Sequence, residues 1–191
     1  MRDGDLLAAT FDETIRLHEI VRQADARPIL DAAQAIAGSL AQGGTLLVFG
    51  NGGSAADAQH MAAELVGRFQ RERAGLRAVA LTTDTSVLTS IANDYSFDRV
   101  FERQIEALGR PGDVALGITT SGASTNVVLA LVAAKERGLR TIALTGRDGG
   151  AAGRAADIHI NIPSESTARV QEVHRTLLHV VCDLVERSSR A

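Results

Sequence analysis

The stretch TLLVFGNGGSAADAQHMAAELVGR, residues 45–68, decides the fold. It begins with an uninterrupted apolar run at 45–50, which is typical of a parallel strand that is buried on both faces. A glycine-rich turn follows and leads at once into a helical pattern, so the segment predicts a strand, a tight turn and a helix. We expect Ser54 to cap that helix.

Four further apolar runs repeat the strand pattern, each separated from the next by a turn or by a segment of helical length. They are LRAVALT at 76–82, DVALGIT at 113–119, LRTIALT at 139–145 and DIHINI at 157–162. Strands that alternate with helices imply right-handed crossovers. The sequence therefore predicts an α/β fold, a doubly wound five-stranded parallel sheet with helices on both faces.

Helices are also expected at both ends of the chain. Apolar residues recur at helical spacing over 7–19 and 29–40, and again over 166–187. Nothing in the sequence suggests an internal linker or repeat. We therefore expect a single domain spanning residues 1–191, with N-terminal helices at 1–42 and a sheet-and-helix core at 43–191.

Composition limits the partners of this domain. Of 191 residues, 45% are apolar and only 3% aromatic, so stacking platforms for single-stranded nucleic acid are not expected. A net charge of −3 argues against a broad surface for nucleic acid or an anionic membrane. Acidic residues interrupt the opening segment, and no apolar stretch approaches the roughly 20 residues that span a bilayer. Together with the single cysteine, Cys182, these features predict a cytoplasmic protein without an internal disulfide.

In a doubly wound sheet, ligands bind beyond the carboxyl ends of the strands. After the first expected strand, Gly50, Gly52 and Ala55 match a loose dinucleotide-binding pattern. That pattern requires an acidic residue at the end of the second strand, and Asp84 comes too late in the chain. A P-loop is excluded because the sequence contains no GK[ST] motif. We therefore expect no nucleotide cofactor.

After the third expected strand, TTSGASTNVV at 119–128 places hydroxyl side chains around a glycine at the start of a helix. Hydroxyls and backbone N–H groups at the positive end of a helix dipole form a phosphate site that needs no lysine. This suits a chain whose only lysine is Lys135. The alternative is a Ser/Thr-rich turn with an ordinary N-cap.

Two helices carry polar side chains at helical spacing. His60 and Glu64 lie one turn apart after the glycine turn, and Gln171, Arg175 and His179 form a stripe on the last helix. The structural alternatives are a surface pair for His60 and Glu64 and a buried core histidine for His179. Gln171 and His179 are separated by about 12 Å along the helix axis. They reach one small site only by leaning toward each other, or else one of them serves a neighbouring subunit.

Five segments of the chain together indicate a protein family far more specifically than any one of them does alone. They are GNGGSAADAQH at 50–60, IANDYSFDRVF at 91–101, TTSGAS at 119–124, ALTGRDGG at 143–150 and ARVQEVHRTLLHVVCDLVE at 168–186. Through them the chain resembles the sugar isomerase (SIS) domain family, and within it the isomerases of seven-carbon sugar phosphates. The resemblance covers essentially the whole chain and implies a single SIS domain that assembles through its N-terminal helices into a homo-oligomer, expected to be a tetramer.

The resemblance also implies roles for individual residues. Glu64 and His179 match the two residues that perform the proton transfers in this family. Some members bind zinc through residues that match His60, Glu64, Gln171 and His179. The implied substrate contacts are Asn51, Gly52, Gly53, Ser54, Glu64, Asn93, Asp94, Thr119, Thr120, Ser121, Ser124 and Gln171, with the Ser and Thr residues around the phosphate. Thr119 stands where serine is usual and keeps the hydroxyl.

The implied activity is that of a ketose–aldose isomerase, converting D-sedoheptulose 7-phosphate to D-glycero-D-manno-heptose 7-phosphate as the first step of bacterial heptose biosynthesis. Such a reaction needs a base that moves a proton between adjacent carbons through a cis-enediol, here Glu64, and an acid for the oxygens, here His179. Zinc would polarise the carbonyl, yet zinc bound to Glu64 would compete with its role as base. The role of zinc stays open between catalysis, stabilisation and occasional occupancy.

Two other classes of protein share this fold. A non-enzymatic adaptor that resembles the replication-initiator-associating protein would lack the Glu and His that this chain carries at positions 64 and 179. A sugar-phosphate sensor joined to a DNA-binding module would need a basic recognition helix, which the opening segment does not offer. The sequence favours the enzyme over both.

Overall fold

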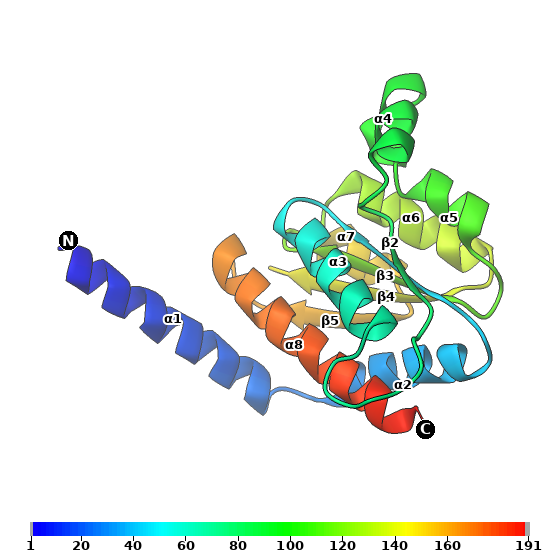
Figure 1. The fold of residues 1–191 in the computed structure, drawn as a ribbon. Helices are drawn as coiled ribbons and strands as arrows, with labels where there is room; N and C mark the ends of the chain where they lie inside the picture. The colour runs from blue at the N-terminus through cyan, green and yellow to red at the C-terminus, as the bar shows by residue number, and fades with distance from the viewer. Residues whose placement is uncertain (1, 190–191) are drawn as a thin grey trace.

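A computed structural model describes residues 2–189 as one domain built on a five-stranded sheet (Figure 1). The strands are β1 (Leu46–Gly50), β2 (Ala78–Ala80), β3 (Val114–Thr119), β4 (Arg140–Gly146) and β5 (Ile158–Ile162). Their order is β2-β1-β3-β4-β5, and every neighbouring pair is parallel. All five expected strands and the doubly wound α/β fold are confirmed.

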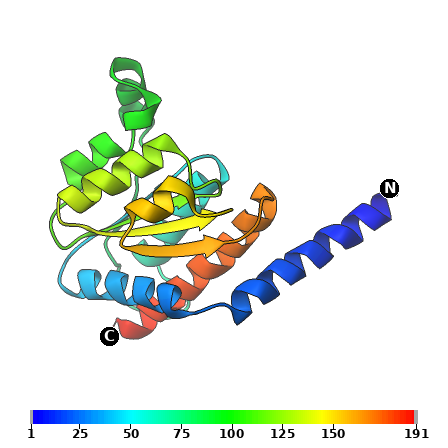
Figure 2. The same cartoon turned by 180° about the vertical axis from the view of Figure 1, so that it is seen from behind.

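Helices cover both faces of the sheet (Figure 2). Within the described residues they are α1 (Asp3–Gln23), α2 (Arg27–Ala41), α3 (Gly53–Val66), α4 (Thr85–Asp94), the 3-10 turn η1 (Phe97–Arg99), α5 (Glu102–Leu108), α6 (Thr125–Glu136), α7 (Gly150–Ala155) and α8 (Thr167–Ser188). Helices α2, α3 and α8 pack on one face, and α5, α6 and α7 on the other. Helices α1 and α4 extend away from this body. Between residues 2 and 189, no helix has the length and apolar character needed to cross a bilayer.

Strand β1 shows why the strands have continuous apolar sequences. Leu46 and Val48 face the layer of α2, α3 and α8, whereas Leu47 and Phe49 face the layer of α5, α6 and α7. All five residues of β1 are buried because both faces of the strand are covered. Small side chains on the helices let the helices approach the sheet closely. The core is therefore filled by close packing and needs few large aromatic side chains.

The strand order brings together the two loops that the sequence predicts to be functional. From β1 the chain crosses through α3 to β2, and from β3 it crosses through α6 to β4, on the opposite side. The crossovers therefore diverge between β1 and β3, at the topological switch point where ligands bind in such sheets. The glycine turn at 50–53 and the hydroxyl loop at 119–124 follow these two strands.

Two carboxylates, those of Asp113 and Asp157, hold the opposite, amino edge of the sheet. Asp113 accepts the backbone N–H of Thr45 at 2.7 Å, which ties β3 to the start of β1. Asp157 accepts the backbone N–H of Thr141 at 3.0 Å and its hydroxyl at 2.9 Å, and pairs with Lys135 at 2.9 Å. These bonds satisfy backbone donors that precede the strand ladder.

Asp157→Asn should destabilise the protein in a pH-dependent way. Burial alone would raise the pKa of Asp157, but Lys135 and the Thr141 donors outweigh it and hold the pKa below its ordinary value of 3.8. The charge therefore stabilises the fold above pH 3.8, and this contribution is lost as pH falls through the lower folded pKa. At pH 7, urea denaturation should show a loss of about 1–3 kcal/mol.

The exposed Asp98 supplies the control, since Asp98→Asn removes the same charge from the surface. The difference in free energy of unfolding between wild type and Asp157→Asn should shrink as the pH falls below 3.8. A difference that stays constant from pH 7 to such acid conditions would contradict the assigned role of the carboxylate.

Candidate active site

The glycine turn carries the chain from β1 directly into α3. Gly52 adopts φ 55°, a backbone region that favours glycine, and is the N-cap of the helix. A side chain at Gly53 would collide with the amide of Gln171 from α8. The expected cap at Ser54 is wrong, because the bend at Gly52 starts the helix at Gly53 and leaves Ser54 buried inside the first turn.

A pair of amides joins this turn to α6. Asn51 Nδ2 donates to Asn126 Oδ1 at 2.8 Å, and Asn126 Nδ2 donates back to Asn51 Oδ1 at 3.0 Å. Each amide keeps one N–H and one lone pair for a further partner. Asn126 was missed as a site residue, although it lies in the quoted hydroxyl segment. The feature that could have identified Asn126 is its position: it is a polar residue in the first turn of a helix, on the face that packs against the sheet.

The hydroxyl loop after β3 converges on the N-terminus of α6. Thr119 Oγ1 lies 2.9 Å from Ser124 Oγ and 3.3 Å from Ser121 Oγ, and Thr120 is half-buried beside them. Ser124 is the N-cap residue of α6, but its hydroxyl bonds Thr119 and does not cap the helix. The Ser124 side chain therefore does not cap the first turn of α6. The three hydroxyls thus lie together at the N-terminus of α6, the kind of position where helix N–H groups can bind a phosphate.

Helices α3 and α8 form the wall of a cavity of about 640 Å³. Gln171 and His179 both line it, so the two ends of the stripe on α8 reach one space within one chain. Between them, Arg175 Nε donates to Asp57 Oδ1 of α3 at 3.0 Å. Asp57 is almost fully buried, and sequence reasoning did not single it out. His18 of α1 lines the same cavity and had no sequence signal beyond helical spacing.

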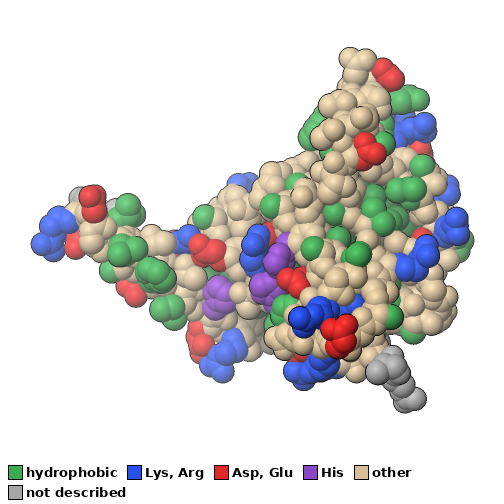
Figure 3. Space-filling model, in the orientation of Figure 1, with side chains coloured by type: hydrophobic (Ala, Val, Ile, Leu, Met, Phe, Trp, Pro, Cys, Tyr) green, Lys and Arg blue, Asp and Glu red, His purple; other side chains and the backbone are tan. Residues whose placement is uncertain are grey.

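At one end of this wall, His60, Glu64 and His179 converge, and histidine side chains gather beside charged ones on this face in Figure 3. The Nε2 atoms of His60 and His179 are 2.8 Å apart, and His60 Nε2 is 3.3 Å from Glu64 Oε1. One ligand atom from each residue lies within 4.8 Å of the others, and all three residues are half-buried. Two imidazoles and a carboxylate are ligands that zinc accepts, so these residues fit a metal ion.

The structure does not bring Asn93 and Asp94 to this wall within one chain. They end α4, the helix that extends from the body, and both are exposed. Asn93 Nδ2 donates to Asp94 Oδ1 at 2.8 Å, so their polar groups contact each other. Their role as substrate contacts stays a prediction.

Comparison with known proteins identifies the family of this chain. A family model described as the SIS domain matches residues 11–146. The chain is 61% identical over 159 residues to the phosphoheptose isomerase of Geobacter sulfurreducens, an alignment that covers 83% of this chain and 84% of that protein. The chain belongs to the phosphoheptose isomerase family of SIS-domain proteins.

Solved structures of phosphoheptose isomerases share the whole fold. The phosphoheptose isomerase of Neisseria gonorrhoeae is 48% identical with a TM-score of 0.91, covering 96% of this chain and 98% of that one. That of Francisella tularensis is 37% identical with a TM-score of 0.94, covering 98% of this chain and all of that one, 100%. The likeness therefore extends over nearly the whole length of this phosphoheptose isomerase family member.

Proposed function

We propose that the protein is a ketose–aldose isomerase that converts D-sedoheptulose 7-phosphate to D-glycero-D-manno-heptose 7-phosphate in heptose biosynthesis. The observation that carries the proposal is the convergence of Glu64 with His179, the latter of which lines the cavity. Membership of the phosphoheptose isomerase family supports the choice of substrate. A non-enzymatic adaptor would have no use for this cluster, so that alternative is not favoured.

The substrate would lie along the carboxyl edge of the sheet. Its phosphate fits the hydroxyls of Thr119, Ser121 and Ser124 at the N-terminus of α6. Thr120 follows Thr119 in the same loop, and Ser54 lies in the first turn of α3. The sugar hydroxyls would meet Asn51 and the backbone of Gly52 and Gly53, and the Gln171 amide that lies against Gly53. This polar lining suits a sugar better than an aromatic platform would.

Proton transfer would be shared between the two helices. The Glu64 carboxylate takes a proton from C1 of the ketose, and the C–H electron pair becomes the C1=C2 double bond of a cis-enediol. His179 donates a proton to the former carbonyl oxygen at C2. His179 then takes the O1 proton and Glu64 returns its proton to C2, which gives the aldehyde at C1 and restores both groups to their starting protonation states.

His60, Glu64 and His179 would hold a zinc ion. Gln171, the fourth ligand that the sequence predicts, has its amide against Gly53 in this chain, two turns along α8 from His179. When bound, zinc would polarise the substrate carbonyl and the adjacent hydroxyl as a Lewis acid. The Glu64 carboxylate would then both bind the ion and accept the substrate proton.

Turnover of sedoheptulose 7-phosphate tests the assignment of the two proton-transfer groups. We expect Glu64→Gln and His179→Ala each to lower kcat by about 10²–10⁴-fold, since each removes one partner in proton transfer. Glu72→Gln is the matched control, because it neutralises a carboxylate that is 90% exposed in the loop after α3. Full activity in either site variant would refute the roles given to Glu64 and His179.

Zinc should stabilise the wild-type protein in the absence of any substrate. At a free zinc concentration about 100-fold above Kd, binding should add roughly 2.7 kcal/mol to the free energy of unfolding, seen as a rise in Tm that a chelator reverses. His60→Ala should abolish this rise. His18→Ala should keep it, since His18 lines the cavity outside the three-residue cluster. Equal responses of both variants would argue against the proposed ligands.

We further propose that the chain forms a homotetramer through its N-terminal helices. Leu7, Phe11 and Ile15 lie in one stripe on α1 and are 61%, 60% and 64% exposed. Apolar stripes of this kind mark protein contacts, and α1 extends from the body where a second copy could cover it (Figures 1 and 3).

The lone, buried Cys182 supports the cytoplasmic location that the sequence predicts, since reducing compartments disfavour disulfides.

Phe11→Glu should therefore reduce the molar mass measured by light scattering on a gel-filtration column, because it places a charge in the apolar stripe. Arg16→Glu should leave the mass unchanged, because Arg16 is exposed on the same helix but lies outside the apolar stripe. An unchanged mass in Phe11→Glu would show that this stripe does not join the subunits.

A further inference from the structure

The segment between α3 and β2, residues 67–77, passes behind the candidate active site, and we call it the α3–β2 loop. We propose that a buried ion pair between Arg73 and Glu186 positions this loop so that Phe69 holds the imidazole of His179. The proposal rests on the proposed function for its kinetic consequences, although the positioning itself is independent of the substrate. Arg73, Glu186 and Phe69 would be positioning residues and not catalytic ones.

Glu186 lies two turns beyond His179 on α8, and its side chain is fully buried. Its carboxylate accepts three consecutive backbone N–H groups of the loop, those of Phe69 at 2.9 Å, Gln70 at 2.9 Å and Arg71 at 2.8 Å. Burial alone would raise the pKa of Glu186, but these donors and Arg73 outweigh it and hold the pKa below its usual value. A charged carboxylate therefore anchors the loop to α8.

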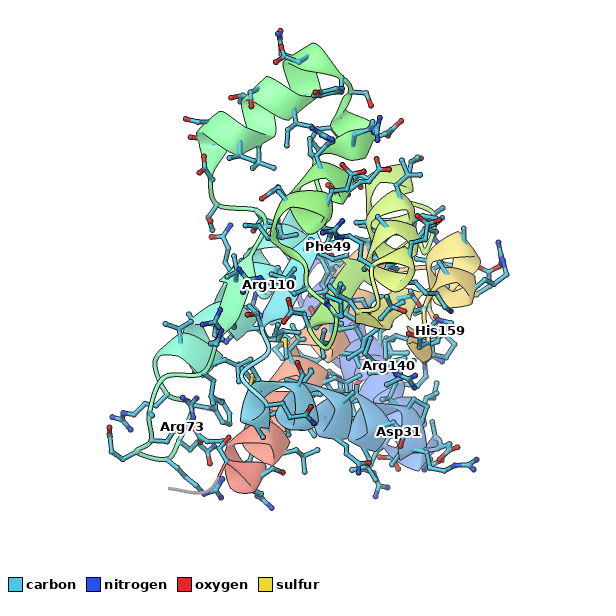
Figure 4. The ribbon with its side chains drawn as sticks, turned by 90° about the vertical axis from the view of Figure 1, so that its right-hand side faces the viewer. Asp31, Phe49, Arg73, Arg110, Arg140 and His159 are labelled. Carbon is cyan, nitrogen blue, oxygen red and sulfur yellow. The ribbon has the colours of Figure 1, made fainter. Side chains whose placement is uncertain are left out.

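Arg73 supplies the opposite charge and binds the end of α3. Its side chain is 5% exposed, and its Nε lies 3.2 Å from Glu186 Oε1. Its Nη atoms donate to carbonyl oxygens in the last turn of α3, to Glu64 O at 2.9 Å and to Leu65 O at 2.8 Å. A cation at a helix C-terminus is favourable because the unpaired carbonyl groups gather there. Figure 4 labels Arg73 in the loop beside the last turns of α8.

Phe69 transmits this anchoring to His179. The Phe69 ring stacks on the imidazole with centroids 5.5 Å apart and an interplanar angle of 26°. His60 meets the same imidazole edge-on, at 5.0 Å and 60°. Both rings restrict the orientation of the imidazole. The ion pair thus supports Glu64 through its backbone carbonyl and His179 through Phe69.

A second ion pair offers a matched control on the same loop and the same helix. Arg71 Nη1 lies 3.0 Å from Asp183 Oδ1, but the two side chains are 48% and 21% exposed. This pair is expected to add little, because solvent screens it. Asp183→Asn therefore removes a loop-to-α8 charge contact without touching the buried pair.

The first measurement is the NMR spectrum of the full-length protein with ¹³C-labelled histidine, its His179 signals assigned with His179→Ala. Ring current from Phe69 should displace the imidazole C–H resonances of His179, and Phe69→Leu should abolish this displacement. Glu186→Gln should move the resonances toward their positions in Phe69→Leu, whereas Asp183→Asn should leave them unchanged. Wild-type resonances in Glu186→Gln would overturn the proposal. If Glu186→Gln does not fold, Glu186→Asp, which withdraws the carboxylate from the loop, replaces it under the same criteria.

The second measurement is isomerisation of sedoheptulose 7-phosphate. Glu186→Gln and Phe69→Leu should lower kcat by about 10- to 100-fold with little change in KM, because a displaced imidazole impairs chemistry more than binding. A lower Tm with unchanged kcat would show that the pair serves stability alone and would overturn the proposal. If the wild-type protein does not turn over this substrate, the proposed function fails, while the NMR measurement still decides the positioning.

Discussion

The contact between α3 and α8 is the constraint on which the candidate site depends. Both helices pack on the same face of the sheet, so side chains on their facing sides must meet. Polar side chains of α8 contact α3 at successive turns. Gln171 lies against Gly53, Arg175 binds Asp57, and His179 contacts His60. One helix alone offers His60 and Glu64, and a third convergent ligand needs the second helix. The glycine at 53 permits this approach because any side chain there would displace Gln171.

The two edges of the sheet use polar groups in opposite ways. At the amino edge, Asp113 and Asp157 are occupied by backbone N–H groups of the neighbouring strands, which makes that edge structural. At the carboxyl edge, Thr119 and Ser124 bond each other, and the Ser124 side chain does not cap α6 behind them. Groups that bond one another and keep spare donors can reorganise around a ligand at low cost. This division is consistent with the proposed phosphate site, which needs no lysine.

The sequence predicted the strands well because each was a continuous apolar run between turns, and burial on both faces of a parallel sheet demands that pattern. It also identified the polar stripes on α3 and α8, since helical spacing reveals which side chains share a face. Spacing does not reveal what that face meets, so Asp57 and Asn126 went unrecognised. The cap at Ser54 was misjudged because the conformation of Gly52, and not the hydroxyl, sets the helix start. Phe69 had no signal, since its contact with His179 joins residues far apart in the chain.

Stability alone does not account for the buried pair behind the site. Replacing a buried ion pair by well-packed apolar residues is often neutral or stabilising, because desolvation of the charges offsets their attraction. Apolar residues could not, however, satisfy the three loop N–H groups that Glu186 accepts, nor the α3 carbonyls that Arg73 binds. A short loop without regular structure has few other means of fixing its backbone beside a helix. The charges therefore specify one loop geometry, and that geometry is the one that places Phe69 against His179.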